Sequence, residues 1–182
     1  MLFGTCNTPI SFDDCTSNMD WFASQLNSAC AKELSINNAL VQSTLLGLQA
    51  YPVVRTAGCL IDQRANTYCY LDAVHASSPA DLYLYQLPLA TPMPQGVTPS
   101  CSACAGSVLG VYFAALQDNA AGNESARGLQ STYESAASNA SSTCGTGYAQ
   151  LLSSGSQPLV NRPSSFLPSM LFLVITALLS IA

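Results

Sequence analysis

The stretch "SACAGSVLGVYFAALQ", Ser102–Gln117, decides the fold class of this chain of 182 residues. Its apolar residues recur mainly at intervals of three and four: Cys104, Val108, Val111, Tyr112 and Ala115. This spacing is the period of the buried face of an α-helix, and alanine, the strongest helix former, recurs along it. The stretch therefore predicts a core helix.

Working outward from this helix, similar patterns predict five more, over residues 19–30, 36–51, 52–62, 66–76 and 125–141. We expect Pro52 to stop or kink the second of these, because the residue before a proline disfavours the helical conformation. In the middle of the chain, tyrosines alternate with leucines and four prolines then fall within twelve residues, Pro88 to Pro99. This part predicts an extended or loop segment. The expected fold is mainly α: a small helical domain with a proline-rich extended segment and a hydrophobic C-terminal tail.

Eight cysteines precede the tail: Cys6, Cys15, Cys30, Cys59, Cys69, Cys101, Cys104 and Cys144. The even number fits four disulfides formed in an oxidising compartment, which would staple the helices together. Spacing alone does not give their pairing. The alternative is a reduced intracellular protein with buried thiols.

The charge balance excludes nucleic-acid binding. Only 8% of the residues are charged, with ten acidic side chains against five basic ones. Nucleic-acid binding requires clustered Lys and Arg, and the arginines of this chain are isolated from one another. The surface is therefore expected to be polar but weakly charged.

The C-terminal end, "FLPSMLFLVITALLSIA" over residues 166–182, is apolar and carries no charge. A polar spacer, Gln157–Ser165, and the small residues 153–156 precede it. This order is that of a signal for a glycosylphosphatidylinositol (GPI) anchor, with attachment expected at Ser154 or Ser153. The chain would then divide into an ectodomain (1–150), a Ser/Pro-rich stalk with the attachment region (151–165) and a hydrophobic signal (166–182). A tail anchor, an ordinary membrane span and a buried core helix are the alternatives.

The N-terminal end, "MLFGTCNTPISFDDC", lacks the basic and apolar regions of a secretory signal. We therefore expect the sequence to be truncated at its N-terminus. If Met1 is the true start, a tail-anchored membrane protein becomes the leading interpretation. Two acceptor sequons, at Asn123 and Asn139, predict N-glycosylation and agree with exposure in the secretory pathway.

Motifs for cofactor or metal chemistry are weak, so neither a cofactor nor a bound metal ion is expected. Cys101 and Cys104 form a C-x-x-C pair, but a proline-rich loop precedes it where a thioredoxin-like redox pair would follow a strand. The gap between Cys59 and Cys69 does not fit the spacing of a structural zinc site. With His75 as the only histidine and no G-x-S-x-G motif, a serine-hydrolase triad has little support.

Two other sets of side chains are candidates for function. Glycoside hydrolysis needs only two suitably spaced carboxylates, and the aspartates that could supply them are Asp62, Asp72, Asp81 and Asp118. An aromatic platform for a sugar could come from Tyr68, Tyr70, Tyr83 and Tyr85. The competing interpretation is that the tyrosine rings cover the core and the aspartates cap helices.

Four segments carry a family resemblance: Cys59-Leu60 with "NTYCYLDAV", then "DLYLYQLPL", "PSCSAC" and Cys144-Gly145. From Cys6 to Gly147 the chain resembles an uncharacterised family of fungal secreted, cysteine-rich proteins, a domain of unknown function whose members often end in a GPI signal. The eight cysteines are too widely spaced for the fungal haem-binding CFEM domain.

The resemblance implies a location at the fungal plasma membrane or cell wall and implies no reaction. We expect a GPI-anchored, non-catalytic surface protein that is structural or binds a cell-wall glycan or a partner and contacts the membrane through its lipid anchor. A small secreted hydrolase that uses paired aspartates is the alternative.

Overall fold

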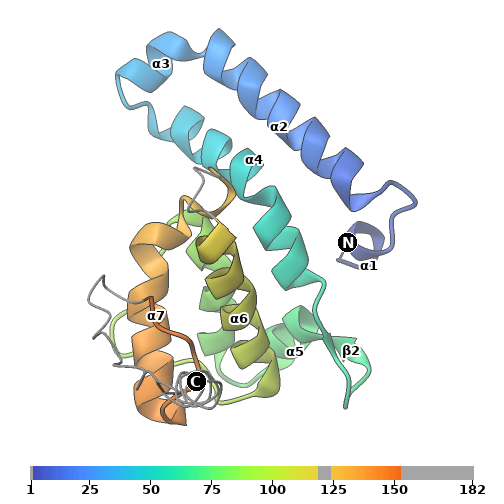
Figure 1. The fold of residues 1–182 in the computed structure, drawn as a ribbon, viewed down its shortest axis with the longest axis vertical. Helices are drawn as coiled ribbons and strands as arrows, with labels where there is room; N and C mark the ends of the chain where they lie inside the picture. Colours follow the sequence, from blue (N-terminus) through green and yellow to red (C-terminus); the bar gives the residue numbers. More distant parts are fainter. Residues whose placement is uncertain (1, 119–123, 153–182) are drawn as a thin grey trace, which may run out of the picture. The chain divides into compact units, whose positions relative to one another are not determined.

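The protein is described by a computed structural model that covers residues 2–118 and 124–152, all within one compact unit. A short helix, α1 (Leu2–Cys6), precedes two long helices, α2 (Phe12–Ala29) and α4 (Ala39–Gly58). These lie antiparallel beside each other and are joined by α3 (Ala31–Ser35), as Figure 1 shows. Side-chain oxygens of Ser11 and Asn38 accept backbone N–H groups and so fix where α2 and α4 begin.

Of the two outcomes predicted at Pro52, a stop or a kink, the stop is wrong, because α4 continues through Pro52 to Gly58. A proline inside a helix costs about 3 kcal/mol or more through the lost hydrogen bond and the steric clash. Beyond it, however, Val53 is only 5% exposed and Ala57 is fully buried. Full burial of a valine contributes about 2 kcal/mol, so core packing beyond Pro52 offsets much of the cost. The separate helix predicted over residues 52–62 is the end of α4.

A small antiparallel hairpin, which was not predicted, follows α4. Its strands are β1 (Ile61–Asp62) and β2 (Thr67–Tyr68), with Ile61 opposite Tyr68. The predicted helix over residues 66–76 is confirmed as a shorter one, α5 (Cys69–His75). Because the hairpin occupies the preceding residues, α5 begins directly after it.

The expectation of an extended segment is wrong for Pro79–Leu89, which form a 3-10 helix, η1. Leu84 and Leu87 are fully buried and lie three residues apart, the period of a 3-10 helix. A proline at the helix start is favourable because its φ is already fixed, and the Ser78 hydroxyl accepts the N–H of Ala80. Residues 91–102, which hold the other three of the four prolines, form neither helix nor strand, as predicted.

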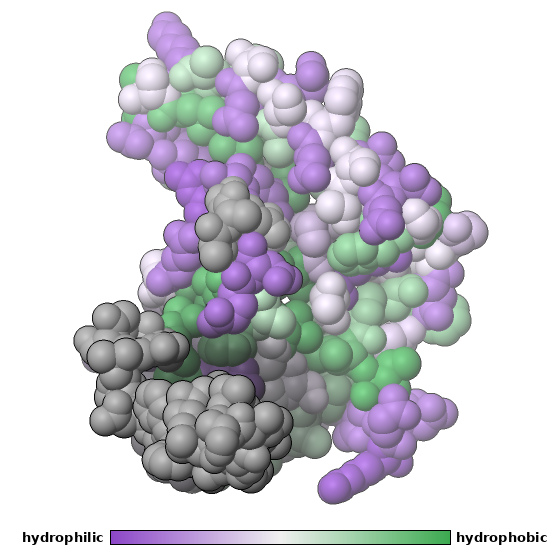
Figure 2. Space-filling model, viewed as in Figure 1, coloured by the Kyte–Doolittle hydropathy of each residue, from purple (hydrophilic) through white to green (hydrophobic). Residues whose placement is uncertain are grey.

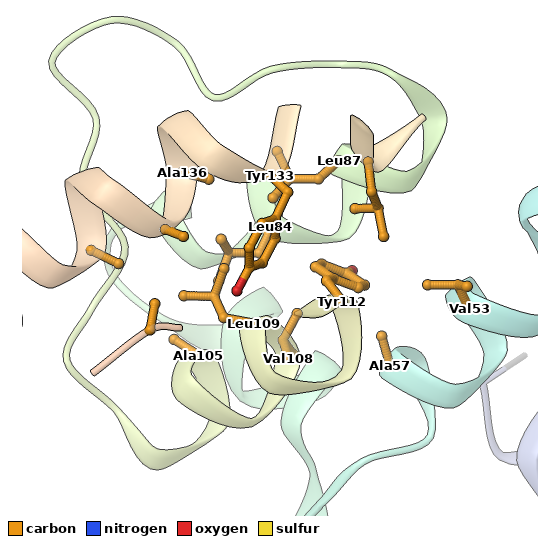
Figure 3. Packing of buried hydrophobic residues seen from close by; sticks show 14 of the residues in the cluster. Val53, Ala57, Leu84, Leu87, Ala105, Val108, Leu109, Tyr112, Tyr133 and Ala136 are labelled. Carbon is orange, nitrogen blue, oxygen red and sulfur yellow. The ribbon is translucent and has the colours of Figure 1, made fainter. Parts of the chain in front are cut away.

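The core lies where α6 (Ala103–Asp118) and α7 (Leu129–Cys144) meet η1 and the second half of α4. A short 3-10 turn, η3 (Glu124–Ala126), precedes α7. Figure 3 shows Tyr112, Tyr133 and Leu84 pointing into this core from three different elements. The helix predicted over Ser102–Gln117 is confirmed as α6, and the mainly α fold is confirmed with it.

Three disulfides join distant segments: Cys6–Cys59, Cys69–Cys104 and Cys101–Cys144. They tie α1 to the end of α4, α5 to α6, and the loop before α6 to the end of α7. The expectation of four disulfides is wrong, because Cys15 and Cys30 have free thiols. Cys15 lies in α2 and Cys30 caps its C-terminal end, so the fifteen residue steps between them span about 22 Å at 1.5 Å per residue, far beyond the reach of a disulfide.

Polar and apolar residues are mixed over the described part of the face in Figure 2. No helix in the described part of the chain is long and apolar enough to cross a membrane. Four predictions lie outside the described residues: the Asn123 sequon, the attachment sites Ser153 and Ser154, and the hydrophobic tail.

Candidate functional site

A cavity of about 370 Å³ brings together three of the four aspartates that the sequence offered as candidates. Asp62, Asp72 and Asp81 line it, with the hydroxyl-bearing residues Ser100 and Ser102. The hairpin, α5, η1 and the start of α6 each supply part of the wall. The fourth candidate, Asp118, lies at the end of α6 and lines a different cavity.

Local backbone structure places Asp62 and Asp72. Asp62 ends β1, and its Oδ1 accepts the backbone N–H groups of Arg64 at 2.7 Å and Ala65 at 3.4 Å, which shapes the turn of the hairpin. Asp72 stands one turn of α5 after Cys69, so the two share a helix face. Both carboxylates are partly buried, and each has an oxygen within 4.8 Å of the other and of Cys104 Sγ.

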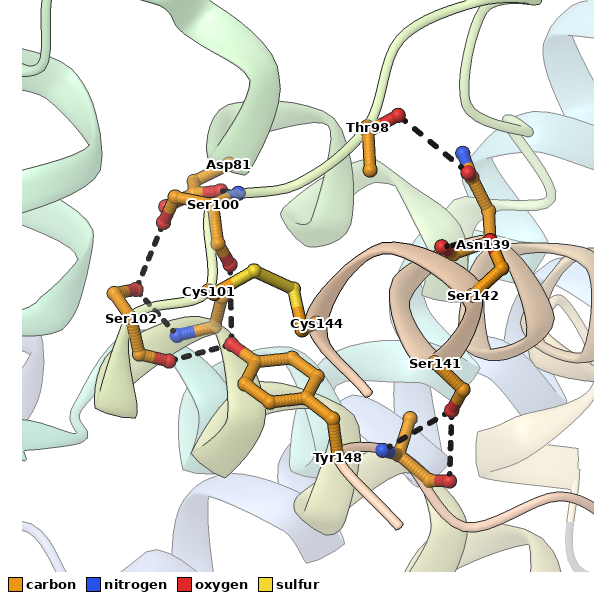
Figure 4. The surroundings of a disulfide bond; sticks show 12 residues. Asp81, Thr98, Ser100, Cys101, Ser102, Asn139, Ser141, Ser142, Cys144 and Tyr148 are labelled. Carbon is orange, nitrogen blue, oxygen red and sulfur yellow. Dashed lines mark hydrogen bonds between the residues drawn. A yellow bond between two sulfur atoms is a disulfide. The ribbon is translucent and has the colours of Figure 1, made fainter. Parts of the chain in front are cut away.

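Asp81 is held at the start of η1 by the segment that leads into α6. Its Oδ1 accepts the Ser100 backbone N–H at 2.6 Å, and its Oδ2 accepts the Ser100 hydroxyl. Ser102 Oγ lies 3.0 Å from Ser100 Oγ and accepts the N–H of Ala105, as an N-cap does. Figure 4 shows this network beside the Cys101–Cys144 disulfide, where the Tyr148 hydroxyl also donates to the carbonyl oxygens of Ser100 and Ser102.

The charged side chains that line the cavity are all acidic. Three carboxylates line it, and none of the described residues around it is basic. Burial, and then the negative charge of Asp81, raises the pKa of Tyr85, another residue of the wall. The phenol therefore stays protonated and can donate a hydrogen bond. The site can accept several hydrogen bonds from a ligand, donate from hydroxyls and attract a cation.

The predicted aromatic platform does not form one flat surface. The rings of Tyr70 and Tyr85 meet edge to face, with centroids 5.0 Å apart and planes at 86°. The Tyr68 hydroxyl accepts the side-chain amide of Asn7 at 2.6 Å, and Tyr83 is partly buried. Among these four tyrosines only Tyr85 lines the acidic cavity, while Tyr70 and Tyr85 together line a neighbouring cavity of about 380 Å³.

The C-x-x-C cysteines are not bonded to each other. Cys101 pairs with Cys144 and Cys104 with Cys69, so each anchors a different helix rather than forming a local redox pair. The wall of the acidic cavity includes the second of these disulfides. Sequence reasoning missed Ser100 and Ser102, although their position on both sides of Cys101, just before a predicted helix, is a capping signal.

The Asn139 sequon lies within α7 and is partly buried. Its side-chain amide donates to the carbonyl oxygen of Val97 at 2.8 Å (Figure 4 shows the nearby contact with Thr98). The hydroxyl of Ser141, the third residue of the sequon, lies 3.1 Å from the Ala149 carbonyl oxygen. A glycan at Asn139 would have to replace the hydrogen bond to Val97, so glycosylation there stays a prediction with a structural cost.

A further cavity, of about 490 Å³, lies between the α2–α4 hairpin and the start of α7. Its polar lining consists of the amides Asn27, Gln42 and Gln49 and of Arg127, whose guanidinium lies 3.4 Å from Glu124. Carboxylates and hydroxyls do not converge on it as they do on the smaller acidic cavity. We therefore take the acidic cavity as the candidate functional site.

A family model described as "Domain of unknown function (DUF7729)" matches residues 1–153. No curated protein and no solved structure matches the chain. The resemblance to a domain of unknown function is thereby confirmed at that level, and the description assigns no activity. The function has to be argued from the residues of the cavity.

Proposed function

This chain belongs to the DUF7729 family, and we propose that it is a secreted surface protein that binds a carbohydrate in its acidic cavity without chemical turnover. The observation that carries the proposal is the convergence of Asp62, Asp72 and Asp81 with serine hydroxyls and Tyr85 in one cavity of about 370 Å³. A cavity of this size lies within the range of small-molecule sites, about 300–1,000 Å³.

Carbohydrates match this lining because they present several hydroxyl groups along one edge. A carboxylate accepts hydrogen bonds from hydroxyl donors, and bonds to a charged acceptor are roughly twice as strong as neutral ones. Tyr85 adds an apolar ring edge and a protonated hydroxyl. The Cys69–Cys104 and Cys101–Cys144 disulfides hold the walls, so little ordering is needed when a ligand binds.

The proposed location follows from the chemistry of the chain. Three disulfides support passage through an oxidising compartment. The small residues, polar spacer and apolar end support a GPI anchor at Ser154 or Ser153, with the protein displayed on a fungal cell surface or wall. Release of the protein from intact cells by phosphatidylinositol phospholipase C tests the anchor, and a protein that resists release while keeping residues 166–182 would contradict it.

Calorimetric titration tests carbohydrate binding. The full-length chain, made in a secreting host, is titrated with oligosaccharides of chitin, β-glucan and mannan. Asp72→Asn should weaken binding by at least about tenfold, because a hydrogen bond to a charged group contributes about 1.5–3 kcal/mol. The matched control is Asp118→Asn, whose carboxyl lies outside the cavity. Equal affinity of the two variants, or no binding of any of the three glycans, would contradict the proposal.

Hydrolysis is the second candidate, because the carboxylate oxygens of Asp62 and Asp72 approach within 4.8 Å. Retaining glycosidases hold their two carboxyl groups about 5–5.5 Å apart. Release of reducing ends from the same glycans measures turnover directly. Turnover by the wild type that disappears in Asp62→Asn with Asp72→Asn would favour hydrolysis, whereas binding without turnover favours the non-catalytic function.

A further inference from the structure

We propose that reduction of the Cys69–Cys104 disulfide turns one end of the acidic cavity into a zinc site, with Cys69, Cys104, Asp62 and Asp72 as ligands. The proposal does not depend on carbohydrate binding, because it concerns a metal ion and the reduced protein. It would make the cavity a site whose occupant changes with the redox state of the surroundings.

Four side chains with metal-binding atoms converge there from three elements. Asp62 comes from β1, Cys69 and Asp72 from one face of α5, and Cys104 from the first turn of α6. Oxygens of the two carboxylates and the Cys104 sulfur all lie within 4.8 Å of one another. Cys69 Sγ is bonded to Cys104 Sγ, so the fourth ligand comes to the same end of the cavity.

The donor set suits zinc. Zinc is bound tetrahedrally by thiolate sulfur and by nitrogen or oxygen, at about 2.3 Å from sulfur and 2.0–2.2 Å from oxygen. Ligand atoms of such a tetrahedron lie about 3.5 Å apart. The carboxylates therefore need to approach by about 1 Å, and the two sulfurs, bonded to each other in the oxidised protein, need to separate after reduction. Rotations of the aspartate and cysteine side chains can supply both movements. Two thiolates exclude harder cations such as magnesium, which prefer oxygen alone.

Reduction is the step that creates the ligands, because metals bind the thiolate rather than the disulfide. A dithiol supplies the two electrons: it becomes a cyclic disulfide, the Cys69–Cys104 bond breaks, and the two hydrogens of the dithiol end on the two sulfurs. Zinc binding then releases those two protons to solvent. In the oxidised protein only the two carboxylates remain as ligands.

A divalent cation would bind the reduced form in preference to the oxidised one. The reduced protein offers two carboxylates and two sulfurs, whereas the oxidised protein offers the two carboxylates alone. A ligand that binds one of two states more tightly shifts the equilibrium towards that state. Reduction and metal binding are therefore expected to be linked, with the ion stabilising the reduced form.

The surrounding fold keeps these side chains in place and leaves them accessible. Cys69 is 3% exposed and Cys104 9% exposed, but both line the cavity of about 370 Å³, through which a small reductant and an ion can enter. The Cys69 N–H donates to the Leu60 carbonyl oxygen at 2.8 Å, and Ala73 of α5 is buried. The start of α5 thus has contacts that remain when the disulfide opens.

Cobalt titration tests the site, because tetrahedral Co²⁺ bound by thiolates has a characteristic absorption spectrum. The full-length chain carries Cys15→Ser and Cys30→Ser throughout, which removes the thiols that are free in the oxidised protein. It is titrated oxidised, and again after reduction with dithiothreitol and removal of the reductant without air. We expect one tetrahedral Co²⁺ per reduced chain and none per oxidised chain, with zinc displacing the cobalt.

Two pairs of variants locate the ion. Cys69→Ser with Cys104→Ser should abolish the tetrahedral spectrum, while the matched control, Cys101→Ser with Cys144→Ser, should keep it. Asp62→Asn with Asp72→Asn should weaken cobalt binding at least about tenfold, by analogy with the 10–100-fold losses when groups that support a metal site are removed. An unfolded reduced chain would bind cobalt through any of its thiols and would not respond to the two aspartates. If replacing the two aspartates leaves the affinity for cobalt unchanged, the proposal is overturned, whether the reduced chain is folded or unfolded.

Discussion

Gly128→Ala should destabilise the protein strongly, because Gly128 lies where the start of α7 meets η1. A Cβ atom built on Gly128 would lie 2.0 Å from the Pro88 carbonyl oxygen, 2.6 Å from its carbon and 2.7 Å from the Ala90 nitrogen. All three are backbone atoms, so no side-chain rotation relieves the clash. The φ of Gly128 is −63°, which alanine adopts freely, so the whole cost is steric.

The size of the effect follows from what has to move. A Cβ rarely approaches another heavy atom closer than about 3 Å, so η1 and α7 must separate by about 1 Å. Overpacking of this kind costs about 1–3 kcal/mol. The separation also stretches the hydrogen bond from the buried Thr132 hydroxyl to the Leu87 carbonyl oxygen, now 2.9 Å, which contributes about 1 kcal/mol. We expect a loss of about 3 kcal/mol in the free energy of unfolding.

Urea unfolding followed by circular dichroism measures this loss as a lower midpoint with an unchanged slope. The control is Gly110→Ala in α6, where nothing lies within 4 Å of the added Cβ. Alanine is the better helix former, so this variant should gain about 0.5–1 kcal/mol. Wild-type stability of Gly128→Ala, or equal losses in the two variants, would refute the packing described between η1 and α7.

Three further predictions follow from the cysteines, a buried tyrosine and a sequon. Intact mass should rise by about six daltons on reduction, two for each of the three disulfides. Alkylation without reductant should label Cys15 and Cys30. A gain of about eight daltons with no labelling would instead indicate a fourth disulfide. Burial, and then the charge of Glu134, raises the pKa of Tyr133 from 10.0 to about 12. As the pH rises, the unfolded chain therefore loses the Tyr133 proton before the folded protein does. The contribution of Tyr133 to stability should be complete below pH 10 and should fall as the pH rises towards 12. Tyr133→Phe should reduce that fall, and an equal fall in the variant would contradict the assignment. A glycan at Asn139 would replace the hydrogen bond from its side-chain amide to the Val97 carbonyl oxygen. Peptide mapping should therefore find Asn139 glycosylated less often than Asn123. Complete glycosylation of Asn139 in folded protein would show that this hydrogen bond is dispensable.

Local sequence patterns predicted the helices and failed where distant contacts decide the structure. The spacing within Ser102–Gln117 is a local property, and α6 formed where it predicted. The leucines of η1 fit a 3-10 helix, but their alternation with tyrosines fits a strand equally well, so only their burial resolves the choice. A stop or a kink was predicted at Pro52 because proline disfavours the interior of a helix. The burial of Val53 and Ala57 in the core offsets this preference, so the helix continues.

The sequence could predict which residues were candidates for the site, but not which of them lie together. The sequence named four aspartates, and the disulfides and hairpin brought Asp62, Asp72 and Asp81 together while leaving Asp118 apart. Cysteine spacing carries no information about pairing, since partners are set by how helices pack across 35 to 53 residues of chain. The free thiols of Cys15 and Cys30 could not be foreseen for the same reason.

Binding of a carbohydrate in the acidic cavity can be detected directly through the alanines of its wall. The measurement is a titration of the full-length chain, with isotope-labelled alanine methyl groups, by oligosaccharides of chitin, β-glucan and mannan, followed by nuclear magnetic resonance. Ala73, Ala76 and Ala105 line the cavity, while Ala137 and Ala140 lie in the core outside its wall. A glycan bound in the cavity should shift the first three methyl signals and leave the other two in place. Shifts confined to other alanines, or no shift with any of these glycans at saturating concentration, would contradict it.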